Sequence, residues 1–159
     1  MISLRAMTQT EFDAYLVSEI PIYAQEKVRA GNWKAEEALA KSQEEFARLL
    51  PQGFATPYQH FFVIEVDGEA AGRIWLSSEP KLAGGAGFIC DLFVAQEFRR
   101  RGVATTAMQL LEDVATDLGL TALALHVFGY NTQARALYAK LGYEITNLNM
   151  TKALRPADV

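Results

Sequence analysis

The segment FICDLFVAQEFRRRGVAT runs from Phe88 to Thr105. Its first part, up to Val94, is almost entirely apolar, which predicts a short strand buried on both faces. Three arginines and Gly102 follow, and the residues after them are small and open a helix. Because a helix start offers unpaired N–H groups and a positive dipole end, this turn predicts a binding site for a pyrophosphate. Taken alone, the same residues also fit a basic loop before an ordinary helix.

Two other kinds of phosphate-binding loop do not fit this turn. A P-loop requires Gly-Lys-Ser or Gly-Lys-Thr, and the sequence contains neither. The dinucleotide fingerprint requires three spaced glycines, whereas Gly102 is the only glycine of the turn. The remaining interpretation is a coenzyme that carries an acyl group on a pyrophosphate-bearing tether.

The composition is that of an ordinary globular protein, with 50% hydrophobic and 21% charged residues among 159. This length fits one domain over residues 1–159. The formal net charge of −4 argues against a nucleic-acid partner, because phosphate backbones attract extended basic surfaces. Cys90 is the only cysteine, and no apolar stretch is long enough for a signal peptide or a membrane span. We therefore expect a cytoplasmic protein with no membrane partner.

The residues before the arginine segment predict a strand, two helices and a hairpin. Apolar positions alternate in residues 2–7 and then recur at helical spacing, although Pro21 should bend or divide that helix. Asn32 is the expected cap of a second, amphipathic helix. Asp67-Gly68 predicts the tight turn of a hairpin, because both residue types accept a positive φ.

The residues after it predict a helix from Val103 to Leu118, a buried strand from Ala122 to Phe128 and a helix capped by Asn131. The segment YEITNLNMTKAL then predicts one or two terminal strands. A strand–helix–strand order around the arginine turn predicts a parallel pair of strands. The fold class is therefore mixed α and β (α+β), with a sheet that is antiparallel early and parallel in its middle.

Two motifs lie on either side of the strand that begins at Ala122. The first follows ICDLFV and consists of Arg99, Gly102 and Ala104; the second consists of Asn131, Ala134, Tyr138, Gly142 and Tyr143. In both, the chain resembles the GCN5-related N-acetyltransferase (GNAT) superfamily, over nearly its whole length. The resemblance implies the family's fold, a mixed sheet of roughly six to seven strands flanked by about four helices. YAQEKVRAGNW, LLPQGFATPYQH and LHVFGYN look like a bacterial subgroup of small acetyltransferases.

The resemblance also implies acetyl-CoA as co-substrate and assigns residues to it. The two parallel strands would separate, and the backbone of Leu92, Phe93 and Val94 would pair with the pantetheine arm like an added strand. Asn131 and Ala134 would line the other side of the arm, together with Tyr138. The pyrophosphate would bind the backbone amides of Arg99, Arg100, Arg101, Gly102, Val103, Ala104 and Thr105.

Acetyl transfer from a thioester to an amine needs a neutral amine, a polarised carbonyl and a proton for the departing thiolate. A backbone N–H near Val94 would polarise the carbonyl, and the phenol of Tyr138 would protonate the sulfur. Asp91 is the leading candidate for the base, ahead of Glu65 and Glu79. Each catalytic candidate has a structural alternative: Tyr138 as a core aromatic residue, and Asp91 as a carboxylate bonded to backbone or to an arginine.

The other chemically active side chains give weaker signals. His126 lies in an apolar strand, where a lone histidine is more often a core residue than a functional one. Cys90 has no adjacent histidine or cation, which argues for direct attack by the amine rather than a covalent route. Two histidines and one cysteine have no metal-ligand spacing, so no metal is expected. Trp33, Tyr15 and Tyr23 either wall the acceptor pocket or pack in the core.

Together these features predict an N-acetyltransferase that moves an acetyl group from acetyl-CoA to a primary amine by direct attack in a ternary complex. The acceptor would be a small molecule or a peptide. The alternative from another class is a non-catalytic acyl-CoA-binding module, such as a sensor or a partner-binding subunit. Terminal strands of the family often pair between chains, so the resemblance leaves a homodimer open.

Overall fold

The computed structural model describes residues 1–81 and 83–155 of the chain. Within these residues, five strands form one mixed sheet in the order β1-β2-β3-β4-β5. The first four strands are antiparallel to their neighbours, and β5 runs parallel to β4. Their bounds are β1 Ile2–Ala6, β2 Gln59–Val66, β3 Glu69–Ser77, β4 Ala86–Val94 and β5 Ala122–Leu125.

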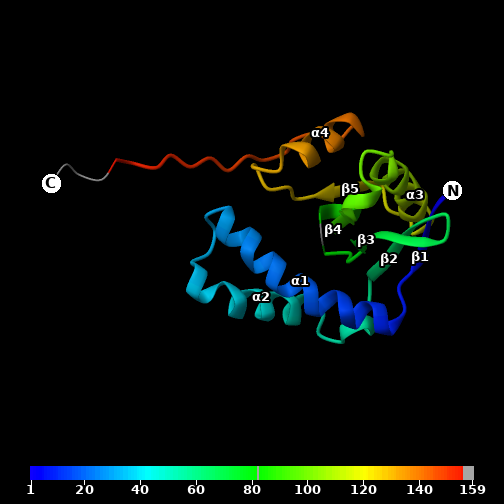
Figure 1. The fold of residues 1–159 in the computed structure, drawn as a ribbon, viewed down its shortest axis with the longest axis horizontal. Helices are drawn as coiled ribbons and strands as arrows, with labels where there is room; N and C mark the ends of the chain where they lie inside the picture. Colours follow the sequence, from blue (N-terminus) through cyan, green and yellow to red (C-terminus); the bar gives the residue numbers. More distant parts are fainter. Residues whose placement is uncertain (82, 156–159) are drawn as a thin grey trace.

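Four α-helices of the described residues pack on the two faces of this sheet, α1 and α2 on one face and α3 and α4 on the other (Figure 1). One core lies between the sheet and α3 and contains Ile74, Leu76 and Met108. The other lies between the sheet and α1–α2 and contains Phe12 and Trp75. The helix bounds are α1 Gln9–Arg29, α2 Ala35–Leu49, α3 Val103–Asp117 and α4 Thr132–Lys140, with short 3-10 turns η1 Gly53–Ala55, η2 Ala83–Gly85 and η3 Gln96–Phe98.

Helix α1 is continuous through Pro21, so of the two expected effects of this proline, a bend or a division, the division is wrong. A proline removes its own N–H and crowds the carbonyl four residues earlier, but its fixed φ is close to the helical value. Packing on α2 supports the helix at this point, because Ser42 Oγ donates a hydrogen bond of 2.7 Å to the carbonyl of Ile20. One uninterrupted helix therefore crosses the sheet face.

The second helix begins later than expected, because Lys34 and not Asn32 is its N-cap. Asn32 instead closes α1: its N–H donates to the carbonyl of Lys27, and the N–H of Gly31 donates to Val28, each at 2.9 Å. These two bonds are the Schellman arrangement of a helix C-terminus. Asn32 is thus used at the end of one helix and does not start the next.

The tight hairpin is confirmed, since Asp67 and Gly68 join β2 to β3 with φ values of 51° and 86°. The parallel pairing of β4 with β5 is also confirmed. Strand β5 is shorter than expected, because it ends at Leu125 and not at Phe128. The backbone after Leu125 no longer pairs with β4, so the two parallel strands diverge beyond this residue.

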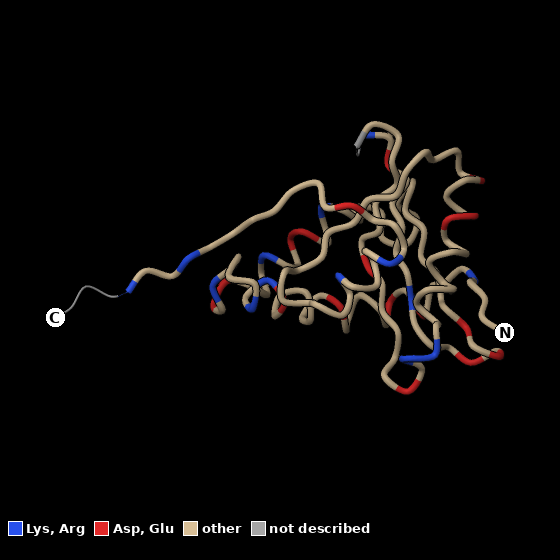
Figure 2. The backbone as a smooth tube through the Cα atoms, turned by 90° about the horizontal axis from the view of Figure 1, so that it is seen from above, with Lys and Arg blue, Asp and Glu red and all other residues tan. Residues whose placement is uncertain are grey.

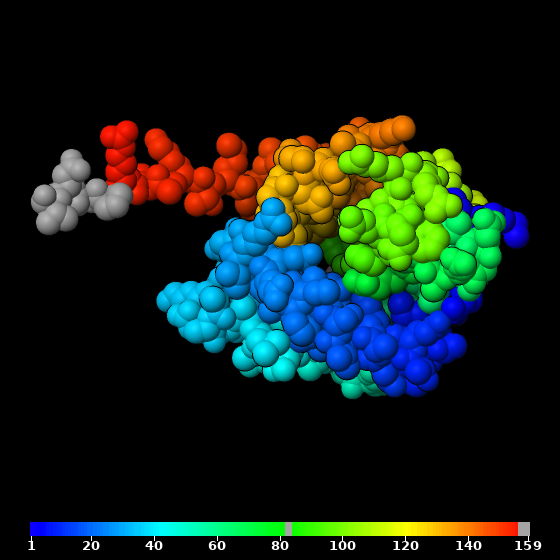
Figure 3. Space-filling model, in the orientation of Figure 1, coloured from blue at the N-terminus to red at the C-terminus, as the bar shows by residue number. Residues whose placement is uncertain are grey.

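The sheet has five strands within the described residues rather than six to seven, because the C-terminal segment forms none. After α4 the chain leaves the body of the molecule as an extended tail, residues 144–155 (Figures 1 and 3), and the view turned by 90° shows the same (Figure 2). No neighbouring strand accompanies it there, so its backbone has no ladder to join. Its apolar side chains are exposed: Ile145 68%, Leu148 68%, Met150 90% and Leu154 83%.

Candidate functional site

Strands β4 and β5 are paired over only part of their length. The ladder joins Ala86–Ile89 to Ala122–Leu125, whereas β4 continues to Val94. On this side, within the residues that the structure describes, the second half of β4 has no neighbouring strand. A strand edge of this kind presents unpaired donors and acceptors to any extended group that lies beside it.

The backbone of Leu92 and Val94 faces this open edge. The N–H of Ala95 donates to the carbonyl of Ala71 at 2.8 Å on the β3 side, and the carbonyl of Phe93 also points at β3. Because successive residues of a strand direct their backbone groups to opposite sides, Leu92 and Val94 direct theirs away from β3. Of the three residues expected to pair with an extended arm, two therefore have the required backbone orientation.

The turn after β4 leaves the start of α3 uncapped. Gly102 is the N-cap, has a left-handed φ of 72° and offers no side chain to the helix. The N–H of Thr106 donates to the carbonyl of Gly102 at 3.0 Å, which is the first hydrogen bond of the helix. The N–H groups of residues 103–105 come before it and have no acceptor within the helix. Arg99 Nε donates to the carbonyl of Val94 at 2.7 Å and holds the turn against the end of β4. Free backbone donors are thus concentrated beside the open strand edge.

A cavity of about 310 Å³ lies at this turn. Arg101, which was expected to take part, does not line it; its guanidinium lies 5.6 Å from the ring of Phe98. Phe98, Gln133 and Leu137 line the cavity and were not predicted. The last two are four residues apart on α4, a helical spacing that could have revealed them. The lining residues are Val94, Phe98, Arg99, Arg100, Gly102, Val103, Ala104, Thr105, Gln133 and Leu137.

Hydrogen bonds at the two ends of helix α4 fix the position of Tyr138. Asn131 is the N-cap as predicted, because its side chain accepts a 3.2 Å hydrogen bond from the N–H of Ala134. At the other end the N–H of Tyr143 donates to the carbonyl of Tyr138, and the two rings lie 5.8 Å apart. Burial, and secondly the negative charge of Asp91, raise the pKa of Tyr138 to about 12. Its phenol is therefore protonated at neutral pH, although Tyr138 does not line the cavity at the turn.

A bulge in β4 decides the direction of Asp91. Trp75 lies opposite Asp91 and Leu76 lies opposite Ile89, so Cys90 is the extra residue on β4. Cys90 packs in the core on the α1 side, and Asp91 reaches a side chain of α1 on the same face. Without this extra residue, strand alternation would direct Asp91 toward the α3 side.

Asp91 is held by two side chains from other elements. Its Oδ2 accepts a 2.8 Å hydrogen bond from Arg73 Nε and a 3.1 Å hydrogen bond from Tyr15 Oη. Arg73 Nη2 also donates to Oε2 of the buried Glu19 at 2.5 Å. Burial, and secondly the charge of Asp91, raise the pKa of Glu19 to about 7. Asp91 is thus bonded to an arginine, as its structural alternative predicted. Glu19 is a buried acid that the sequence patterns did not reveal.

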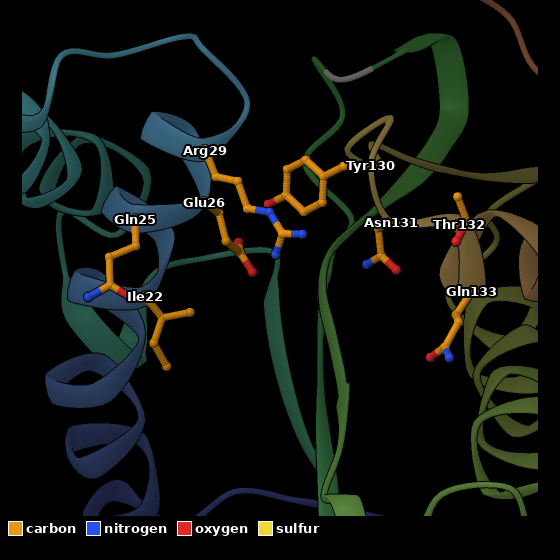
Figure 4. A pocket seen from close by; sticks show the side chains of 8 residues that line it. All are labelled: Ile22, Gln25, Glu26, Arg29, Tyr130, Asn131, Thr132 and Gln133. Atoms are coloured by element: carbon orange, nitrogen blue, oxygen red, sulfur yellow. The ribbon is translucent and has the colours of Figure 1, made fainter.

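A second cavity, of about 500 Å³, lies between α1 and the residues that precede and begin α4 (Figure 4). Burial, and secondly the charge of Asp91, raise the pKa of Glu26 on its wall. The guanidinium of Arg29 lies 4.1 Å from the ring centroid of Tyr130, across the cavity. None of the ion pairs among the described residues includes Glu26 or Arg29. The lining residues are Ile22, Gln25, Glu26, Arg29, Tyr130, Asn131, Thr132 and Gln133.

The surroundings of the weaker candidates do not favour a catalytic role for them. Burial raises the pKa of Cys90 to about 12, so its thiol is a poor nucleophile. His126 is exposed just beyond β5. Tyr23 packs its ring edge-on against Trp33, and Tyr15 belongs to the buried core. Tyr23 and Trp33 therefore serve packing, Tyr15 packs in the core and also donates to Asp91, and none of the three lines the second cavity.

Glu65 and Glu79, the other carboxylates considered for the base, lie elsewhere. Glu65 is ion-paired with Arg5 at 2.6 Å, and Glu79 follows the end of β3. Over residues 1–81 and 83–155, no three His, Cys, Asp or Glu side chains gather in a way that could hold a metal ion. In the same residues, no helix has both the length and the apolar composition needed to cross a bilayer. The expected lack of a metal, a membrane partner and a nucleic-acid partner stays a prediction.

Comparison with known proteins agrees with this architecture. Residues 26–143 match the acetyltransferase (GNAT) family. The chain is 36% identical to the uncharacterized N-acetyltransferase YycN of Bacillus subtilis (strain 168) over 154 residues, which cover 96% of this chain and 99% of YycN. It is 35% identical to the uncharacterized N-acetyltransferase YdgE of the same organism over 153 residues, 96% of this chain and 98% of YdgE. The chain therefore belongs to the GNAT family of acetyltransferases.

Two solved structures show the same fold. The crystal structure of YycN has a TM-score of 0.91 to this chain at 35% identity, covering 98% of this chain and 100% of the other. AAC(6')-Iy in complex with the bisubstrate analog CoA-S-monomethyl-acetylneamine has a TM-score of 0.63 at 20% identity, covering 98% and 99%. At that identity the second likeness shows the fold alone.

Proposed function

We propose that this protein is a single-domain N-acetyltransferase that moves an acetyl group from acetyl-CoA to a primary amine by direct attack in a ternary complex. One observation carries the proposal: the unpaired edge of β4 leads directly to the uncapped start of α3 and its cavity. An extended arm and the pyrophosphate to which it is joined need these two features side by side. The relatives named as N-acetyltransferases and the coenzyme A moiety bound to AAC(6')-Iy support the same assignment.

The residues present fit this coenzyme. Amides of residues 103–105 would bind the pyrophosphate, and nothing lies within 4 Å of a Cβ placed on Gly102, so the space beside them is free. Leu92 would pair with the pantetheine arm through its outward backbone groups, whereas Val94, whose carbonyl already accepts from Arg99, would offer only its outward N–H. Phe93, whose ring lies 4.4 Å from the Arg73 guanidinium, would contribute a side chain and not its backbone. Asn131 and Ala134 remain the proposed lining on the α4 side.

The bound coenzyme supplies a thioester: the acceptor nitrogen bonds the acetyl carbon, the carbon–sulfur bond breaks and its electron pair leaves on sulfur. The outward N–H of Val94 would stabilise the negative charge that develops on the carbonyl oxygen. Tyr138 would donate its phenolic proton to the sulfur and regain a proton from solvent. Its raised pKa keeps that proton in place at neutral pH.

The proton of the amine requires a base, for which Asp91 is the leading candidate from the sequence. Because the Oδ2 of Asp91 already accepts from Arg73 and Tyr15, we assign to Asp91 the positioning of these side chains and the negative potential of the site. Glu26 is the better proton acceptor, since it lies on a cavity wall without an ion-pair partner among the described residues and its pKa is raised. A carboxylate of raised pKa is a stronger base.

Acetyl-CoA binding and turnover test this function. Millimolar acetyl-CoA should raise the melting temperature, because a ligand that binds only the folded state stabilises it. Addition of amine acceptors should then release free thiol from acetyl-CoA. A melting temperature that does not change with acetyl-CoA would exclude the assignment. Binding without thiol release for any amine would favour the non-catalytic acyl-CoA-binding module.

We also propose that the protein is a homodimer in which the C-terminal tail, residues 144–155, adds to β5 of a second copy. The edge strand β1 carries a protective charge, Arg5, in ion pairs with Glu11 and Glu65. The other edge, β5, reads ALAL and has neither charge nor proline, which leaves it open to pairing. The exposed apolar residues of the tail are of the kind that such an edge would bury.

Deletion of the chain from Glu144 onward should convert a dimer into a monomer, measured by light scattering after size-exclusion chromatography. Changing both Leu148 and Met150 to aspartate should have the same effect with full chain length. Leu118, an exposed residue at the end of α3, offers the control Leu118→Asp, which should stay dimeric. A full-length protein that is monomeric at high micromolar concentration would contradict the dimer.

The proposal extends to the location of the protein, its source and its acceptor. We propose a cytoplasmic location, because Cys90 is a free thiol and a reducing compartment keeps it so. The relatives from Bacillus subtilis favour a bacterial source. The acceptor is a small molecule or a peptide. The charged side chains around the second cavity distinguish between these two classes.

A further inference from the structure

One face of α1 carries charged side chains and borders the second cavity. Glu19, Ile22, Glu26 and Arg29 follow one another at three- and four-residue spacing, which puts them on one stripe of the helix. Glu19 is buried against Arg73, Glu26 is half-buried, and Arg29 is exposed at the helix end. The stripe therefore changes from negative in the interior to positive at the mouth of the cavity.

The aromatic ring of Tyr130 positions the guanidinium of Arg29. The guanidinium carbon lies 4.1 Å from the ring centroid, and the ring of Tyr130 stacks in turn on Phe128 at 5.5 Å with an interplanar angle of 4°. Figure 4 shows the guanidinium between α1 and Tyr130, above the Glu26 carboxylate. A guanidinium that stacks on a ring keeps its N–H edge free, and that edge matches the two oxygens of a carboxylate.

The charges that face Glu26 favour a cation beside it. Burial and the negative charge of Asp91 raise the pKa of Glu26, and the positive charge of Arg73 lowers it. Arg73 is itself shared by Glu19 and Asp91, so two carboxylates contact one arginine and Glu26 adds a third negative charge at longer range. An ammonium group next to Glu26 would compensate this negative potential, whereas a second ammonium at the cavity mouth would meet Arg29.

We propose that the acceptor is a small amine with a carboxylate several bonds from its reacting nitrogen, as in an amino acid whose side chain ends in an amine. Glu26 binds the ammonium end and receives its proton, and Arg29 binds the carboxylate end. The cavity, about 500 Å³, has the size of a small-molecule site. This inference rests on the acetyl transfer proposed above and selects the small molecule over the peptide.

Three acceptors of matched length test the inference on the full-length protein. They are ε-aminocaproate, hexylamine and hexamethylenediamine, which share a six-carbon chain and have a carboxylate, a methyl group or a protonated aminomethyl group at the far end. The value of kcat/KM, measured by thiol release, should be about tenfold or more higher for ε-aminocaproate than for the other two. Equal values for the three would overturn the inference and leave acetyl transfer standing. No transfer to any amine would overturn both.

Charge reversal at Arg29 supplies the second test. Arg29→Glu should invert the order, so that hexamethylenediamine becomes the best acceptor, while the thermal shift with acetyl-CoA stays that of the wild type. The matched control is Lys27→Glu, because the ammonium of Lys27 lies over the rings of Tyr23 and Trp33 and not in the cavity. That variant should keep the wild-type order. An unchanged order in Arg29→Glu, or the same inversion in both variants, would contradict the carboxylate site.

Discussion

Tyr138→Phe is expected to lower kcat for acetyl transfer about 100-fold or more, the usual loss when a positioned general acid is removed. The affinity for acetyl-CoA should change little. The ring of Tyr138 packs against Tyr143 and against the core between the sheet and α3, and phenylalanine keeps both contacts. Among the described residues the phenol has no hydrogen-bond partner, so its loss leaves no protein group unpaired. The change therefore removes the proton and little else.

The matched control is Tyr143→Phe. Both phenols have a pKa raised to about 12, burial being the larger cause in each, and the two rings touch. Only Tyr138 is proposed to reach the sulfur, so Tyr143→Phe should retain near wild-type kcat. Steady-state kinetics with a fixed amine and a thermal shift with acetyl-CoA give both readouts. Equal kcat values for wild type and Tyr138→Phe would remove Tyr138 from the mechanism.

Gly102→Val is expected to weaken acetyl-CoA binding at least 100-fold. The space beside Gly102 is open, so the new side chain meets no protein atom and instead fills the position proposed for the pyrophosphate. The left-handed φ of 72° is also unfavourable for a β-branched residue. Stability should therefore fall by about 1–2 kcal/mol, and coenzyme binding by much more than that loss explains.

The opposite end of the same helix provides the control for this strain. Gly119 follows α3 with a φ of 79°, and nothing lies within 4 Å of a Cβ placed on it. Gly119→Val should lose a similar amount of stability by denaturant unfolding and still bind acetyl-CoA like the wild type. If calorimetric titration gave Gly102→Val an unchanged affinity for acetyl-CoA, the pyrophosphate would have to bind elsewhere.

Local features of the fold could be predicted because neighbouring residues decide them. The Asp67-Gly68 turn, the helix after Gly102 and the Asn131 cap each depend on a few adjacent residues, and each was confirmed. The anion site at the turn stays a proposal, and it too depends on neighbouring residues, since its donors are consecutive backbone amides. The wrong cap at Asn32 shows the limit: a residue suited to start one helix was already used to end another.

The cluster of charged side chains beside the second cavity could not be predicted in this way, because its members come from distant parts of the chain. Glu19 and Glu26 lie on α1, Arg73 on β3 and Asp91 on β4, and charges gather only when these elements pack together. The sequence patterns made Asp91 the leading candidate for the base and left open whether an arginine would bind it. The prediction of terminal strands was wrong for a similar reason, since a strand forms only beside another strand.

The order of the elements up to α4 could be predicted from the residues alone, because it rests on short-range backbone geometry and side-chain periodicity, and the family could be predicted from the resemblance of two short motifs. The direction of Asp91 could not, since it depends on how the strands pack. The extra residue at Cys90 shifts the strand by one position and turns Asp91 toward α1, where Arg73 and Tyr15 bind it. A one-residue shift exchanges the two faces of a strand, and only the pairing of β3 with β4 reveals it.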